Sequence, residues 1–87
     1  HYYQDGSSLY VVDRNRTRIY HPDSARVGEK IRDNGVVDRV LNGEEGALEL
    51  TDETGTEMLA GFAPIRQTHW GVVAQRPRAA TLTGLDQ

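Results

Sequence analysis

Apolar residues recur at every second position along most of the chain, which is the period of a β-strand with one buried face. The first such stretch, residues 8–13 (SLYVVD), is followed by residues 17–21 (TRIYH), and the two are predicted to form a hairpin. Asn15 is the predicted tip of the connecting turn, because its short amide side chain tolerates a positive φ.

The pattern becomes helical over residues 34–42 (NGVVDRVLN). Four apolar residues there follow the spacing i, i+1, i+4 and i+5, which places them on one helix face: Val36, Val37, Val40 and Leu41. Asn34 or Asp33 can cap the start of this helix, and Gly43 suits a left-handed C-terminal cap. One short helix is therefore predicted.

Three further strands are predicted over residues 46–51, 57–64 and 70–76, separated by short turns. Consecutive strands joined by short turns pair in antiparallel fashion. The chain thus reads as two strands, a loop with one helix, and a three-stranded meander. This order predicts an α+β fold with a five-stranded antiparallel sheet.

Composition narrows the class of protein. A chain of 87 residues forms one domain and buries roughly 60% of the surface that its unfolded form exposes. The net charge is −3 and the ten basic residues are scattered, so a nucleic-acid partner is not expected. Without cysteine there is no disulfide, thiolate nucleophile or cysteine-bound zinc. No apolar run reaches the roughly 20 residues of a membrane-spanning helix.

The tripeptide His21-Pro22-Asp23 allows three interpretations. It matches the J-domain co-chaperone signature, but there it lies between two helices, and here it follows a predicted strand. It could form half of a metal or acid–base site with His69, although no HxH or HExxH spacing supports this. The favoured interpretation is a turn at the end of a strand, with His21 able to line the rim of a pocket.

No catalytic residue, metal site or cofactor is predicted, since the chain lacks GxSxG, SxxK, GxxxxGK and GxGxxG motifs. Aromatic and arginine side chains are the candidate ligand-binding groups, because tyrosine hydroxyls hydrogen-bond and guanidinium groups grip carboxylates. The aromatic residues could equally be core. The candidates are Tyr10, Tyr20, His21, Trp70, Arg32 and Arg66.

The order and spacing of five stretches resemble the Cache family of bacterial extracytoplasmic sensor modules. These stretches are LYVVDRNRTRIYHPD, VGEKI, VVDRVLNGEEGALEL, GTEMLAGFAPI and THWGVVAQRP, which together cover most of residues 9–77. The resemblance implies a PAS-like fold without catalysis, in the periplasmic part of an inner-membrane receptor such as a histidine kinase, chemoreceptor or diguanylate cyclase. It is closest to the membrane-proximal module type. It also implies that a ligand pocket, if present, lies between the sheet and residues 27–41.

The resemblance also implies boundaries. Residues 1–8 are expected to be a lead-in left from a longer segment, residues 9–77 the sensor module, and residues 78–87 a helical tail that leads toward a transmembrane helix. Two departures stand out, because Arg16 lies near the usual hairpin glycine, and the long N-terminal helix of the family is missing. A homodimer is expected, since self-association could cover the exposed sheet.

Three hypotheses for function follow. In the first, the module detects a small polar ligand, such as an amino acid or short carboxylate, and passes the signal across the membrane. In the second, it binds nothing small and serves as a spacer and dimer contact of the same kind of receptor. The third and weakest is a metal-assisted enzyme that uses His21 and Asp23.

Overall fold

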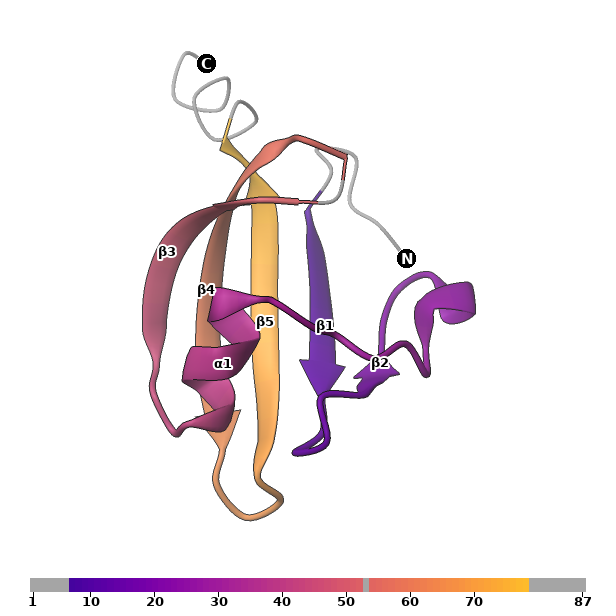
Figure 1. The fold of residues 1–87 in the computed structure, drawn as a ribbon, viewed down its shortest axis with the longest axis vertical. Coiled ribbons are helices and arrows are strands. Elements are labelled where there is room, and N and C mark those ends of the chain that lie inside the picture. Colours follow the sequence, from indigo (N-terminus) through magenta and orange to yellow (C-terminus); the bar gives the residue numbers. More distant parts are fainter. Residues whose placement is uncertain (1–6, 53, 79–87) are drawn as a thin grey trace.

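The computed structural model describes residues 7–52 and 54–78, and in this part of the chain five strands form one antiparallel sheet (Figure 1). Its strands lie in the order β2-β1-β5-β4-β3, and a single helix, α1, packs on one face. The elements are β1 (Ser8–Val12), β2 (Arg18–Tyr20), a 3-10 turn (Ser24–Arg26), α1 (Gly35–Leu41), β3 (Gly46–Thr51), β4 (Glu57–Ile65) and β5 (Trp70–Pro77). The predicted α+β, PAS-like fold is confirmed.

The predicted lead-in, residues 1–8, and the predicted tail, residues 78–87, lie at the two ends of the chain. Residues 1–6 of the predicted lead-in, and all of the predicted tail except Arg78, lie outside the described residues. No helix among the described residues is long and apolar enough to cross a membrane.

The first hairpin differs from its prediction in two respects. Strand β2 has three residues, because Thr17 makes only an isolated bridge with Lys30. The positive φ lies at Arg16, at 68°, so the expectation that Asn15 would carry it was wrong. The Asp13 carboxylate accepts hydrogen bonds from the amides of Asn15 and Thr17, at 2.9 and 3.0 Å, and this closes the turn with the left-handed residue one position later.

Helix α1 begins and ends as the sequence predicts. The Asn34 side chain accepts hydrogen bonds from the amides of Val36 and Val37, at 2.9 and 3.1 Å, and so satisfies two of the helix's first N–H groups. Gly43 has a φ of 86°, which a glycine adopts without strain. The valines of the helix are buried and turn toward the sheet.

The core lies between α1 and the face of the sheet that the helix covers. Alternate residues of the central strands supply it, since Tyr10, Val73 and Phe62 are neighbours in the sheet across β1, β5 and β4. The opposite face, called here the open face, carries a row of small or apolar residues that crosses four strands. This row consists of Leu9, Ala74, Gly61 and Ala47, and Leu59 lies beside it.

Candidate functional site

A cleft of about 350 Å³ lies between the sheet and the segment that precedes α1. Tyr10 of β1 and Gln75 of β5 contribute to its sheet side, residues 50–52 at the end of β3 form another wall, and residues 29–34 close it. Its charged side chains belong to four basic residues and three acidic ones: Arg18, Arg26, Lys30, Arg32, Glu29, Asp33 and Asp52. The lining is therefore polar, with a small excess of positive charge.

Arg18 of β2 is the most buried charge of this cleft, with 7% of its surface exposed. Its guanidinium lies over the Tyr10 ring, 4.5 Å from the centroid, in a cation–π contact. Its Nε is buried and, in the part of the chain that the structure describes, has no hydrogen-bond partner. A buried donor without an acceptor is costly, so this atom calls for a water or ligand oxygen.

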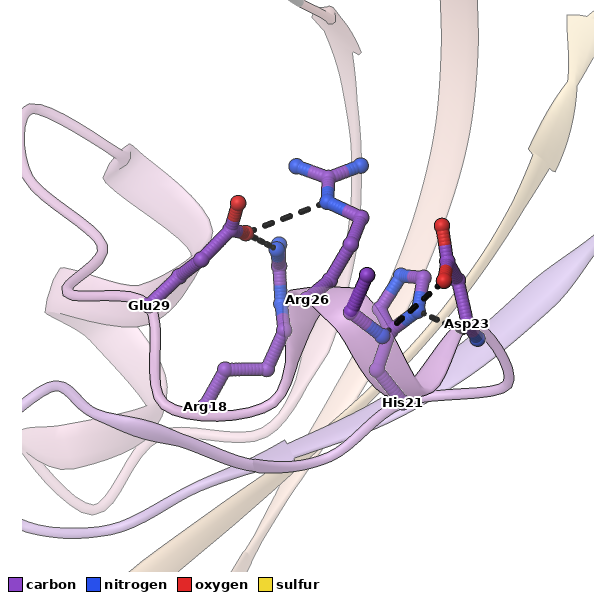
Figure 2. A network of polar contacts seen from close by, with 6 residues as sticks. Arg18, His21, Asp23, Arg26 and Glu29 are labelled. Atoms are coloured by element: carbon purple, nitrogen blue, oxygen red, sulfur yellow. Dashed lines mark hydrogen bonds and ion pairs between the residues drawn. The ribbon is translucent and has the colours of Figure 1, made fainter.

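One carboxylate oxygen connects two of the three arginines of the cleft, Arg18 and Arg26. Glu29 Oε1 lies 2.5 Å from Arg18 Nη1 and 3.1 Å from Arg26 Nε, and Figure 2 shows both guanidinium groups converging on it. The backbone fixes this arrangement, because the amide of Arg18 donates to the carbonyl of Glu29 at 2.8 Å. We refer to these three side chains as the Arg18–Glu29–Arg26 triad.

His21 lies behind the cleft and is buried, with its ring stacked near Tyr10 at a centroid distance of 6.3 Å. Its Nδ1 accepts a hydrogen bond from the amide of Asp23 at 3.0 Å, and the Asp23 carboxylate accepts one from Ala25 (Figure 2). Burial lowers the pKa of His21, and the positive charges of Arg18 and Arg26 lower it further. The imidazole is therefore neutral near pH 7. The predicted turn at His21-Pro22-Asp23 is present.

Asp52 directly follows β3 and lines the cleft. Burial raises the pKa of its carboxyl, but hydrogen bonds from the Thr54 hydroxyl and from the amides of Thr56 and Thr54, together with the Arg26 charge, outweigh burial and leave the pKa below its ordinary value. The cleft thus offers the Asp52 carboxylate as well as guanidinium groups.

The six candidate residues from the sequence fall into different places. Tyr10 and Arg32 line the cleft, and His21 contacts Tyr10 from behind. Tyr20 is half exposed. Trp70 and Arg66 line a separate depression of about 150 Å³ near the C-terminal end of α1. The structure therefore brings three of the six together, and ligand binding by any of them stays a prediction.

Sequence reasoning missed Arg18 and Glu29 as members of the site. Alternation predicts that Arg18 and Tyr20, two residues apart on one strand, share a face. The pairing of β1 with β2 shifts register between Val11 and Val12, so Tyr20 pairs with Val11 and Arg18 pairs with Val12. The available signal was an arginine inside a predicted strand, next to Ile19.

The residues of the site can bind an anionic or zwitterionic small molecule. A carboxylate ligand would satisfy guanidinium donors, and an ammonium group would find a partner in Asp52. Among residues 7–52 and 54–78, no group of three or more histidine, aspartate and glutamate side chains could hold a metal ion.

Comparison with solved structures defines the class of fold. The ligand-binding domain of Mlp24 with asparagine superposes with a TM-score of 0.72 at 19% identity, over 93% of this chain and 32% of that one. The periplasmic sensory domain of the Campylobacter jejuni chemoreceptor Tlp1 gives a TM-score of 0.74 at 16% identity, over 90% and 30%. The E. coli DcuS sensor domain gives 0.65 at 25% identity, over 87% and 58%.

These neighbours are receptor sensor or ligand-binding domains, and the resemblance to Cache modules is confirmed at the level of the fold. The chain spans less than two thirds of the length of each of these three proteins. A comparison with protein-family models finds no match, and a comparison with curated proteins finds none either.

Proposed function

We propose that this domain is a non-catalytic, extracytoplasmic sensor of a bacterial signal-transduction receptor, and that it binds a small ligand with a carboxylate group in the cleft at Arg18. The observation that carries the proposal is the buried Arg18 guanidinium, which faces a polar cleft and has one donor without an acceptor among the described residues. The fold supports it, as does the asparagine in one similar structure, the ligand-binding domain of Mlp24.

In this mechanism the ligand favours one of two arrangements of the segment between β2 and α1. A ligand shifts such an equilibrium only through its different affinity for the two states. The segment contributes cleft residues and leads directly into α1, which packs on β4 and β5. The change would leave the domain through the chain that follows β5, toward a transmembrane helix and the output domain of a histidine kinase, chemoreceptor or diguanylate cyclase.

Thermal unfolding of the domain against a panel of amino acids, short carboxylates, amines and neutral amides tests this proposal. A ligand at about 100 times its Kd stabilises the folded state by about 2.7 kcal/mol, which raises Tm by several degrees in a domain of this size. The shift should disappear in Arg18→Gln and persist in Arg66→Gln, which removes an exposed cation outside the cleft. A flat panel with well-folded protein would refute ligand sensing.

The open face of the sheet favours a second candidate, a spacer that forms a homodimer. A shallow hollow of about 490 Å³ lies over this face, and Leu9 and Ala74 in its row are exposed. Sheet faces with this composition are usually covered by another layer. Sedimentation of the wild type and of Ala74→Arg tests this: a dimer that Ala74→Arg dissociates supports the candidate, and a monomer at high concentration refutes it.

A further inference from the structure

Glu29 already occupies one donor of each of two arginines in the cleft. Its Oε1 accepts from Arg18 Nη1 and from Arg26 Nε, so one carboxylate oxygen serves two guanidinium groups. Charge-assisted contacts of this kind are what a carboxylate ligand would make at the same place. A ligand that binds these donors must therefore take the position of the Glu29 carboxylate.

The Arg18 and Glu29 side chains of the triad differ in burial. The Arg18 side chain is 9% exposed, whereas that of Glu29 is 45% exposed at the mouth of the cleft. The Glu29 backbone does not depend on its side chain, because Arg18 N donates to Glu29 O and Gly28 N donates to Arg18 O, at 2.8 and 2.7 Å. The carboxylate can swing out into water while the backbone pairing stays intact.

We propose that Glu29 competes with the ligand for Arg18 and Arg26. Its carboxylate occupies a guanidinium donor of each and so excludes anions that bind weakly, until the carboxylate of a ligand displaces it. This inference rests on the proposed function, since it assumes that a small carboxylate binds in this cleft. Displacement also has a structural consequence. Arg26 ends the 3-10 turn of residues 24–26, and its ion pair with Glu29 ties that turn to the segment leading into α1.

Titration with succinate, followed by amide chemical shifts in ¹H–¹⁵N NMR spectra, tests the inference. The variants are Glu29→Gln, which keeps the shape of the side chain and removes its charge, and Glu29→Asp, which keeps the charge and shortens the reach. Glu45→Gln is the matched control, because it removes one negative charge from an exposed position outside the cleft. Succinamide, which lacks carboxylates, is the control ligand.

We expect Glu29→Gln to bind succinate about tenfold more tightly than the wild type, because a competitor lowers apparent affinity by the fraction of sites it blocks. Glu29→Asp should also bind succinate more tightly than the wild type, because the shorter side chain reaches the two arginines less well. This second variant keeps the test valid if Glu29→Gln does not fold. Glu45→Gln should match the wild type, and succinamide should bind none of them.

The possible outcomes distinguish failure of the Glu29 inference from failure of the proposed ligand-sensing function. If the wild type binds succinate and the Glu29 variants bind it equally or more weakly, Glu29 is not a competitor, although the domain still binds a carboxylate. If neither the wild type nor the variants bind succinate while only an amine or neutral amide raises Tm in the panel above, the inference fails and so does the proposal of a carboxylate ligand at Arg18, whereas sensing of a different ligand stands. Failure of every ligand in both experiments refutes both.

Discussion

Val40 of α1 packs directly on Gly71 of β5, so closely that a β-carbon placed on Gly71 would lie 2.5 Å from Val40 Cγ1. This contact lies where α1 packs on the sheet, against β4 and β5. The absence of a side chain at position 71 therefore sets the distance between the two layers of the domain. The segment that closes the cleft is attached to this helix, so the same contact also positions the site.

Gly71→Ala should destabilise the domain by about 1–3 kcal/mol, because overpacking forces the helix or the strand to move. Gly61→Ala is the matched control, since a β-carbon there would meet its nearest atom, the Gly46 carbonyl oxygen, at 3.9 Å. That control should be neutral or stabilising by about 0.5–1 kcal/mol, because glycine in a strand costs backbone entropy. Urea unfolding of the three proteins measures the difference.

Val40→Ala in the Gly71→Ala background shows whether the clash is the cause. Removing the valine methyl groups leaves room for the new β-carbon, so the two changes together should cost about 1 kcal/mol less than the sum of their separate effects. Strict additivity would mean that Gly71→Ala acts through something other than Val40.

Asn34→Ala should lower the free energy of unfolding by about 1 kcal/mol, which is the usual cost of losing an N-cap. The reason is the loss of the acceptor for two helix amides, those of Val36 and Val37. Asn42→Ala, at the other end of α1, is the control, because its side chain makes an exposed 3.4 Å hydrogen bond to Glu44. Equal effects of the two changes on urea unfolding would contradict the capping role.

Arg16 joins the first hairpin to α1, since its Nε donates to the Ile31 carbonyl at 2.7 Å and its Nη1 lies 2.6 Å from Asp38 Oδ1. Arg16→Ala should cost about 1–2 kcal/mol, mostly through the loss of the partly buried bond to Ile31. Asp38→Asn removes only an exposed ion pair and should cost less than about 1 kcal/mol. Thermal or urea unfolding distinguishes these values.

Arg16→Gly adds a backbone test to the same series. Both Arg16→Ala and Arg16→Gly lose the side-chain contacts, but only glycine adopts a φ of 68° without strain. Arg16→Gly should therefore be more stable than Arg16→Ala by about 1 kcal/mol. The reverse order would mean that the left-handed conformation costs nothing at this turn.

The elements of the fold were predictable because short-range signals specify them. The valines of α1, the Asn34 cap and the left-handed Gly43 all lie within one helix and its ends, and the three-strand meander follows from alternation and short turns. The left-handed residue of the first hairpin was mispredicted because propensity favours Asn15, although the resemblance places a hairpin glycine near Arg16. The Asp13 carboxylate closes the turn through the amides of Asn15 and Thr17, and the positive φ lies at Arg16 between them.

The site was less predictable than the fold. Tyr10 and Arg32 were found because aromatic and arginine residues stand out in any sequence, and they line the cleft. Arg18 was missed because one shift of register turns it to the core side, and no local pattern marks such a shift. Glu29 was missed for a related reason, since only the pairing of its backbone with Arg18 brings it to the cleft.

The last prediction concerns pH and His21, whose pKa is lowered in the folded state by burial and by the charges of Arg18 and Arg26. The unfolded chain, with an ordinary pKa near 6.5, then binds a proton that the folded protein does not. Stability from this residue is complete above about pH 6.5 and declines as the pH falls from there through the lowered pKa. Protonation would also cost the hydrogen bond that Nδ1 accepts from Asp23.

Unfolding by urea at pH 7.5, 6.5, 5.5 and 5.0 tests this, with His21→Asn as the variant and His69→Asn as the control. Asparagine can accept the Asp23 amide hydrogen bond without titrating, so His21→Asn should show a weaker loss of stability on acidification than the wild type. His69 is exposed and has a φ of 59°, which asparagine tolerates, so His69→Asn removes a histidine elsewhere in the domain without straining the backbone. If the wild type and His21→Asn lose stability in parallel as the pH falls, His21 is not the group responsible. The two proteins differ only at this residue, so its removal would then have left the pH dependence of stability unchanged.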